Sequence, residues 1–343
     1  MQPIRPLFQR YPHLAPHLPW LPLAELPTRV EKLPGLPNGW IKRDDQTHAK
    51  YGGNKVRKLE FVAAEMRALG TKQAYTFGAT GTNAGVAAAL ACRDLGVQLT
   101  VFTFNQPWSQ VVERNQAVMR ALGARLIHCG SLLATALAFY LHPARLRKDT
   151  YFLFAGCSNP SGIFGYVNAA LELQEQIHAG EVPLPQAIVV PVGSNGTLAG
   201  LAVGLHLAGV QTQLVGVRVA ASHLGPIPTC TQGEVQKMVN KTVQFLRLHV
   251  PELRDLKVTA PQLEEKYYGA GYGVPTAAGQ AAIARFDADF GVRLEATYSG
   301  KAAAAFLDVC AKTPEPVLFW DTFNSRPTES LLAPPAAGLE ATA

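Results

Sequence analysis

One lysine of the sequence stands where amine chemistry could take place. Lys55 lies within residues 51–60, YGGNKVRKLE, directly after two glycines and an asparagine. The apolar spacing beyond it predicts a helix over residues 54–69, with Asn54 as its N-cap and Gly70 as its end. Because a helix N-terminus disfavours positive charge, this position should lower the pKa of the Lys55 amine, and Schiff-base chemistry needs a partly neutral amine. Taken alone, the stretch could also be a basic surface turn.

A second stretch has the features of an anion-binding loop. The sequence VVPVGSNGTLAGL, residues 189–201, predicts a buried strand that ends at Val192, then a short loop and a helix. Backbone N–H groups and the positive end of a helix dipole both favour a bound phosphate or carboxylate. The loop residues are Gly193, Ser194, Asn195, Gly196 and Thr197. A tight turn with a Ser or Thr cap is the alternative interpretation.

The elements that must position these residues alternate along the chain. Strand patterns occur at 39–45, 73–78, 98–104, 124–129, 149–154, 186–193 and 213–220. Helix patterns occur at 83–96, 110–123, 131–147, 167–177 and 197–209. This alternation predicts an α/β fold with parallel twisted sheets flanked by helices. The Pro-rich first 40 residues are expected to lie as an arm across the folded body.

Composition narrows the class of protein. The chain has 343 residues, of which 48% are hydrophobic and 16% charged, as in a globular protein. The net charge of +6 comes from scattered cations, so nucleic acid is not expected as a partner. The five cysteines show neither disulfide nor metal-site spacing, which indicates free thiols. No apolar run of about 18 residues and no signal peptide is visible, so we expect a cytoplasmic protein with no membrane partner.

A reactive lysine, a phosphate loop and an α/β chain together suggest pyridoxal 5′-phosphate (PLP) as cofactor. The segment at 26–60 resembles the D-cysteine desulfhydrase / 1-aminocyclopropane-1-carboxylate (ACC) deaminase family, whose fold is the tryptophan-synthase-β-like PLP fold (fold type II). The resemblance continues in order over about residues 20–325. Its further segments are FGATGTNAGVAAALA, GCSNPSGIFGYVNAALEL, VGSNGTLAGL, GYGVPTAAG and YSGKA.

The resemblance implies a role for each matched residue. Lys55 would carry the cofactor and move the Cα proton of the substrate, next to Asn54 in the same motif. The loop Gly193 to Thr197 would hold the phosphate, and Asn83 would hydrogen-bond the ring hydroxyl of PLP. The positions that would lie beside the substrate are Thr82, where the family usually has Ser, and the tyrosines Tyr272 and Tyr298. Ser299 would face the pyridine nitrogen, with Thr322 near it.

Ser299 indicates which reaction to expect. The family's ACC deaminases place a Glu at this position, and a carboxylate keeps the pyridine protonated as a strong electron sink. A hydroxyl does not hold that proton, and the weaker sink suits β-elimination of a good leaving group such as thiolate. Glu295 is the nearest carboxylate in sequence. If residues 295–299 form a strand, however, Glu295 and Ser299 lie about 13 Å apart, which makes Glu295 an unsuitable substitute.

The expected function is therefore PLP-dependent α,β-elimination on a small amino acid, with D-cysteine as lead substrate. ACC deamination is the first alternative, and a PLP-binding protein without lyase activity, or with another amino-acid substrate, is the second. Two departures from the family concern the substrate: Thr82, in place of Ser, adds a methyl group beside it, and residues 321–326 read DTFNSR where His-Thr-Gly-Gly is common. Gly81, next to Thr82, replaces a common Gln. Arg57 and Lys58 are expected to have structural or solvated roles, and ion pairs of these cations with the RDD segment at 43–45 are the alternative.

The predicted domain organisation has the active site in a cleft between two α/β units. A small domain is expected over 53–165 and a large PLP-binding domain over 1–52 plus 166–330, followed by a loose C-terminal tail over 331–343. The resemblance also implies a homodimer.

Overall fold

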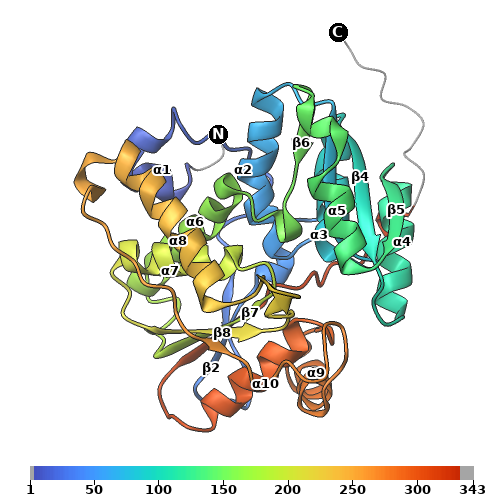
Figure 1. Cartoon of the computed structure of the whole chain (residues 1–343). Coiled ribbons are helices and arrows are strands. Elements are labelled where there is room, and N and C mark those ends of the chain that lie inside the picture. Colours follow the sequence, from blue (N-terminus) through green and yellow to red (C-terminus); the bar gives the residue numbers. More distant parts are fainter. Residues whose placement is uncertain (1–3, 333–343) are drawn as a thin grey trace.

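The computed structural model describes residues 4–332 and contains two separate α/β sheets (Figure 1). The larger sheet has the strand order β1-β2-β12-β7-β8-β11, and only the β1–β2 pair is antiparallel. Its strands are β1 (Val30–Lys32), β2 (Gly39–Lys42), β12 (Val317–Trp320), β7 (Ala187–Val192), β8 (Gln213–Arg218) and β11 (Leu263–Glu264). The α/β fold with parallel sheets is thus confirmed.

The smaller sheet is entirely parallel, with the strand order β5-β4-β3-β6. Its strands are β5 (Arg125–Gly130), β4 (Gln98–Phe104), β3 (Gln73–Ala79) and β6 (Thr150–Phe152). A short hairpin of β9 (His223–Leu224) and β10 (Ile227–Pro228) stands apart from both sheets. The boundaries predicted for the two domains stay a prediction.

Helices cover both faces of the larger sheet, which explains why the sequence of β7 is apolar throughout. Ile188 and Val190 belong to a core with α6 (Pro160–His178) and α7 (Gly196–Ala208), whereas Val189 belongs to a core on the opposite face. That second core contains α9 (Ala277–Phe290) and α10 (Ser299–Cys310), which lie below the sheet in Figure 1. Since successive side chains of a strand point to opposite faces, a strand covered on both sides has no polar positions.

The remaining helices complete the two units. They are α1 (Pro6–Arg10), α2 (Asn54–Ala68), α3 (Asn83–Asp94), α4 (Gln110–Ala121), α5 (Leu132–Tyr140) and α8 (Gln232–His249). Helix α2 contacts both α6 and α3 and contributes residues to a core on each side. None of the helices within residues 4–332 combines the length and the apolar character needed to cross a membrane.

Three predictions of local structure need correction. Asn54 is the first residue of α2 and not its cap, because Gly53 with φ 97° takes the N-cap position. The helix predicted over 131–147 ends at Tyr140, and a 3-10 helix begins at Pro143, whose ring cannot continue an α-helix. The helix predicted from 167 begins at Pro160 instead, where proline suits the first helical turn.

The predicted loose tail lies mostly outside the described residues. Residues 333–343 are not among them, and the start of the predicted segment is ordered. A 3-10 helix spans Glu329–Leu331, and the side chain of Leu331 is buried in the core beneath α3.

Candidate active site

Lys55 lies at the start of α2, where two glycines let the chain pass close to other backbone. A Cβ added to Gly52 would lie 2.0 Å from the carbonyl oxygen of Asp45. A Cβ added to Gly53 would lie 3.0 Å from the carbonyl oxygen of Thr322, the same oxygen that accepts the Asn54 N–H at 3.1 Å. Lys55 is thereby placed at the carboxyl ends of the parallel strands β7 and β12, where α/β sheets bind ligands.

The amine of Lys55 has a lowered pKa, as predicted. Burial lowers the pKa to about 8, opposed by Cys157 and Glu295, so burial rather than the helix end is the main cause. The Nζ donates a hydrogen bond to Asn54 Oδ1 at 2.5 Å and lies 5.9 Å from the centre of the Tyr298 ring. An amine with this pKa is partly neutral near physiological pH, as a Schiff-base lysine must be.

The loop of residues 193–197 lies beside this lysine. Asn195, at φ 65°, is the N-cap of α7, so backbone N–H groups at that helix end have no helical partner. The Asn54 Nδ2 donates to Thr197 Oγ1 at 3.0 Å, which ties the lysine motif to the loop about 140 residues later. Gly193 packs so closely that an added Cβ would lie 2.9 Å from the Tyr298 ring.

Lys58 is a site residue that the sequence interpretation missed. Its side chain is fully buried, and Nζ donates to Ser158 Oγ at 3.0 Å and to the Gly156 carbonyl oxygen at 3.2 Å. A Cβ added to Gly196 would lie 3.3 Å from this Nζ. Burial and then Lys55 lower the pKa of Lys58 to about 7. A solvated role is therefore wrong, and the i, i+3 spacing from Lys55 was the signal for a shared helix face.

The residues around this loop fit the phosphate of PLP. The N-terminus of α7, the Lys58 amine and the hydroxyls of Ser158 and Ser194, which lie 2.9 Å apart, face the same small space. Helix N-termini with N–H and cationic donors are suited to phosphate groups.

Asn83 and Thr82 sit at the start of α3 but face different surroundings. Asn83 Oδ1 accepts from Asn115 Nδ2 at 2.8 Å, which leaves the Asn83 amide N–H groups to donate elsewhere. Thr82 is the N-cap, and its Oγ1 accepts the Gly85 N–H at 3.2 Å. A neighbouring cavity is lined by Asn83 but not by Thr82. The structure gives Thr82 a capping contact, and its contact with a substrate stays a prediction.

The two predicted tyrosines are in direct contact. The hydroxyl oxygens of Tyr272 and Tyr298 lie 2.6 Å apart. Burial raises the pKa of Tyr272 to about 12. Burial, and secondly the neighbouring Tyr272, raise the pKa of Tyr298 well above its usual value. Both hydroxyls therefore keep their protons at neutral pH. The buried Lys301 supports the Tyr272 loop, since its Nζ donates to the carbonyl oxygens of Tyr268 at 2.6 Å and Gly271 at 3.1 Å.

Ser299 and Glu295 lie in contact, and the predicted separation of about 13 Å is wrong. Residues 295–299 form the turn that begins α10 rather than a strand, and Ser299 Oγ accepts the Glu295 N–H at 2.8 Å. The Glu295 carboxylate accepts the N–H groups of Thr297 at 2.7 Å, Tyr298 at 2.6 Å and Ser299 at 2.9 Å. The carboxylate therefore caps the helix, and the Ser299 hydroxyl donates a long hydrogen bond of 3.4 Å to the Glu295 carbonyl oxygen.

The segment DTFNSR packs against the lysine motif. Thr322 accepts from Asn54 through its carbonyl oxygen, and Asn324 Oδ1 accepts the Gly52 N–H at 2.7 Å. Asp321 is fully buried, and burial together with the nearby Asp45 raises its pKa well above the usual carboxyl value. These contacts help to fix the glycines that precede Lys55.

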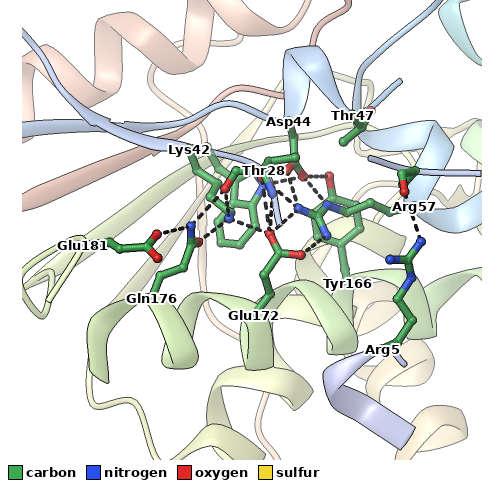
Figure 2. A network of polar contacts seen from close by, with 12 residues as sticks. Arg5, Thr28, Lys42, Asp44, Thr47, Arg57, Tyr166, Glu172, Gln176 and Glu181 are labelled. Carbon is green, nitrogen blue, oxygen red and sulfur yellow. Dashed lines mark hydrogen bonds and ion pairs between the residues drawn. The ribbon is translucent and has the colours of Figure 1, made fainter. Parts of the chain in front are cut away.

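A buried polar network includes Arg57, which belongs to the same helix as Lys55 (Figure 2). The Arg57 guanidinium, from α2, binds Asp44 at 2.7 Å and 2.8 Å and Glu172, from α6, at 2.9 Å. Glu172 also pairs with Lys42 at 2.6 Å. The positive charges of Arg57 and Lys42 hold the pKa of Glu172 low although the carboxylate is buried. Further donors to Asp44 are Thr28, Tyr166 and Trp320. The alternative of ion pairing with the RDD segment is confirmed for Arg57, and the network joins β2, α2, α6 and β12.

Comparison with known proteins agrees with this geometry. The family model described as "Pyridoxal-phosphate dependent enzyme" matches residues 21–321. The chain belongs to this family of PLP-dependent enzymes. Among its PLP-dependent relatives, a protein named D-cysteine desulfhydrase from Serratia proteamaculans is 33% identical over 322 residues, covering 89% of this chain and 93% of the relative. A D-cysteine desulfhydrase from Klebsiella pneumoniae is 32% identical with the same coverage.

Solved structures of other proteins have the same fold. A protein described as an ACC deaminase homologue superposes with a TM-score of 0.77 at 26% identity, covering 97% of this chain and 99% of the other. A threonine deaminase from Solanum lycopersicum gives a TM-score of 0.63 at 18% identity, covering 95% of this chain and 86% of the other, and so shares the fold alone. The predicted resemblance, fold type and PLP cofactor are confirmed.

Proposed function

We propose that this enzyme catalyses α,β-elimination on a small amino acid, with D-cysteine as lead substrate and with pyruvate, ammonia and sulfide as products. The observation that carries the proposal is that Ser299, a neutral hydroxyl and not a carboxylate, stands at the start of α10, where it accepts the Glu295 N–H at 2.8 Å and donates only a long hydrogen bond of 3.4 Å to the Glu295 carbonyl oxygen. A neutral donor leaves the pyridine nitrogen unprotonated, which suits departure of a thiolate more than opening of a cyclopropane ring. The relatives named D-cysteine desulfhydrase support the same choice.

Each residue would contribute a separate part of the reaction. PLP, when bound, supplies the electron sink for the negative charge that develops at Cα. Lys55 would hold the cofactor covalently and then, as a partly neutral amine, take the Cα proton. The Tyr272–Tyr298 pair would hold a proton near the leaving sulfur, because both hydroxyls are neutral.

Binding of the cofactor would rest on a second set of residues. Lys58 and the N-terminus of α7 would neutralise the phosphate, with Gly193, Ser194, Asn195, Gly196 and Thr197 forming the loop. Asn83 would donate its amide N–H to the ring hydroxyl, since its Oδ1 already accepts from Asn115. Asn54 would position Lys55 against the loop, and Thr322 would fix the start of α2 through its carbonyl oxygen.

The test compares two substrates on the PLP-loaded protein. We expect pyruvate and sulfide from D-cysteine, little 2-oxobutyrate from ACC, and no product from either with Lys55→Ala. Faster release of 2-oxobutyrate from ACC than of pyruvate from D-cysteine would overturn the choice of reaction. Covalently bound PLP without turnover of any D- or L-amino acid would show that the protein is not a lyase.

ACC deamination is the second candidate, and one contact favours it. Glu295 lies next to Ser299, so a carboxylate is present within this turn even though three N–H groups occupy it. Substitution Glu295→Gln separates the two functions. An ACC deaminase that depends on this charge would lose activity, whereas the proposed elimination needs Glu295 only as a helix cap, a role that Gln partly keeps.

We also propose that the enzyme works as a cytoplasmic homodimer with the active site between a small domain at 53–165 and a large domain formed by 1–52 and 166–330. The resemblance to the family supports the dimer. Sedimentation of the purified protein at the mass of one chain, across the concentration range used for the assays, would contradict it.

A further inference from the structure

Gln106 lies in the loop after β4, and its side chain reaches the loop after β3. In the smaller sheet these two parallel strands pair with Ala79 opposite Phe104, and the Thr80 N–H donates to the Phe104 carbonyl oxygen at 2.9 Å. The residues two positions beyond that pair, Gly81 and Gln106, are thereby brought together. The Gln106 Oε1 atom accepts the Gly81 N–H at 3.1 Å, which fixes the amide group of Gln106 beside the start of α3.

Gly81 has no room for a side chain of its own. A Cβ added to it would lie 2.8 Å from both the Cα and the Cγ2 atoms of Val112, so a larger residue would have to displace α4. The Gly81 carbonyl oxygen accepts from Asn115 Nδ2 at 2.8 Å, and the same Nδ2 donates to Asn83 Oδ1 at 2.8 Å. Both backbone polar groups of Gly81 thus have side-chain partners, which holds this loop and the Gln106 amide in one arrangement.

The contact with Gly81 leaves the amide nitrogen of Gln106 unused. Because a backbone N–H can only donate, the atom that faces Gly81 must be the amide oxygen, and Nε2 keeps its two N–H donors. Within residues 4–332 this Nε2 has no hydrogen-bond partner. Gln106 is half-buried and lines the same cavity as Asn83, Tyr272 and Tyr298. A fixed amide with unused donors in such a cavity is suited to orient a ligand through one of its oxygen atoms.

The surroundings of this donor favour a negatively charged oxygen. The first N–H groups of a helix have no helical partner, and in α3, which begins at Asn83, the Thr82 hydroxyl accepts only that of Gly85. The positive end of the α3 dipole also favours an anion. Glu295 is the acidic residue of the lining, and its carboxylate is occupied by three N–H groups. An amino acid offers one suitable group, its α-carboxylate.

The chemistry of PLP brings the carboxylate of a bound amino acid close to Asn83. In the proposed function, Asn83 donates to the ring hydroxyl of PLP. The substrate nitrogen bonds to the aldehyde carbon, which is attached next to this hydroxyl, and the carboxylate carbon is two bonds beyond that nitrogen. Gln106 and Asn83 line one cavity and are linked to each other through Gly81 and Asn115. The unused donor and the carboxylate therefore belong to the same part of the cavity.

We propose that Gln106 binds the α-carboxylate of the amino-acid substrate through Nε2, and that this contact lets the enzyme select amino acids over simple amines. The assignment rests on the proposed function, because it takes the ring hydroxyl of PLP to lie beside Asn83. The carboxylate does not react, so its contact with Gln106 is the same before and during the elimination. Loss of the contact should therefore raise KM more than it lowers kcat.

The binding test uses alanine, as both enantiomers, and ethylamine, which differs from alanine only by lacking the carboxylate. Neither compound has a leaving group on Cβ, so the absorbance of bound PLP reports only that the amine has displaced Lys55. The variant Gln106→Glu keeps an acceptor for the Gly81 N–H but replaces the donor by a negative charge. The Kd of the alanine enantiomer that binds should rise about 10- to 150-fold, as loss of a hydrogen bond to a charged group would give. The Kd of ethylamine should change little, and KM for D-cysteine should rise by a similar factor with kcat nearly unchanged.

The variant Gln106→Leu separates substrate binding from a purely structural role. A residue that only supports Gly81 would be replaced well by Glu, which keeps an acceptor, and badly by Leu, which has none. The proposed donor is absent from both variants, so both should bind alanine weakly, and Glu at least as weakly as Leu. The matched control is Gln116→Glu, which adds the same charge on α4 but does not line this cavity and should leave both Kd values unchanged.

Arg293 is the cation of the cavity lining and the other group that could pair with a carboxylate. Weaker binding of alanine in Arg293→Met but not in Gln106→Glu overturns the assignment to Gln106. Equal weakening of alanine and ethylamine in Gln106→Glu, or of neither, overturns it as well. In each of these cases, pyruvate released from D-cysteine by the wild type leaves the elimination standing. A wild-type enzyme whose PLP absorbance responds to no amino acid overturns both proposals.

Discussion

The hydroxyl groups of Tyr272 and Tyr298 share one hydrogen bond of 2.6 Å, although the two residues belong to different elements. Tyr272 lies in the loop before α9, and Tyr298 is the residue before α10. Their rings meet edge to face with centres 5.8 Å apart. Because each hydroxyl contacts the other, neither can change its protonation or orientation alone.

This contact predicts non-additive effects of substitution. Tyr298→Phe and Tyr272→Phe should each lower kcat by about 100-fold, the lower end of the usual contribution of acid–base groups. The double variant should be little worse than either single variant, since the pair acts as a unit. Steady-state kinetics of the three variants check this, and multiplicative losses in the double variant would show that the tyrosines act independently.

The lowered pKa of Lys55 predicts how attachment of PLP to the apoenzyme depends on pH. Only the neutral amine attacks the aldehyde, so the attachment rate should rise with pH below about 8 and level off above it. A lysine with an ordinary pKa would still gain rate well above pH 9. Stopped-flow absorbance after mixing apoenzyme with PLP gives the profile, and a rate that continues to rise throughout would contradict the burial of this amine.

Removal of the Lys58 ammonium should weaken binding of the cofactor through its phosphate. Lys58→Met keeps most of the side-chain volume but loses a charged donor, and such contacts contribute about 1.5–3 kcal/mol. The Kd for PLP should therefore rise by roughly 10- to 150-fold. Pyridoxal, which has no phosphate, is the matched ligand, and its Kd should change little. Equal weakening of both ligands would mean that Lys58 only supports the fold.

Loss of one member of the buried network should destabilise the fold far more than loss of a surface pair. Arg57→Met leaves Asp44 and Glu172 without their main partner, which should cost about 3–5 kcal/mol of unfolding free energy. The control is Arg147→Met, whose solvent-exposed pair with Asp149 should leave the free energy of unfolding almost unchanged. Urea unfolding of both variants measures the difference. A small effect of Arg57→Met would indicate that water or rearranged side chains replace the guanidinium.

Local sequence rules predicted the alternating elements, the buried strand before Gly193 and the glycines before Lys55. The sequence also has a helix-breaking residue at Pro143, but the apolar pattern continues beyond it and led to the prediction of a longer helix. Periodicity could not show that residues 295–299 form a turn. That outcome depends on the Glu295 carboxylate finding three N–H groups at the start of α10.

Long-range contacts were the other part that sequence could not supply. The burial of Lys58 and its place beside the loop depend on Ser158 and Gly196, which lie about 100 and 140 residues later and contact its amine. Likewise, the cavity that Asn83 lines is also lined by Trp108 and Ile283, which come from two parts of the chain that no motif connects.

The position of β12 bears on when this enzyme can form its active site during synthesis. This strand, residues 317–320, lies in the larger sheet between β2 and β7, and the residues after it accept hydrogen bonds from Gly52 and Asn54. A ribosome releases the N-terminal elements first. A nascent chain therefore has the lysine motif and the phosphate loop long before it has the strand that holds them in place. Capture of PLP should accordingly follow the emergence of the last strand, so that an incomplete chain does not carry the reactive cofactor.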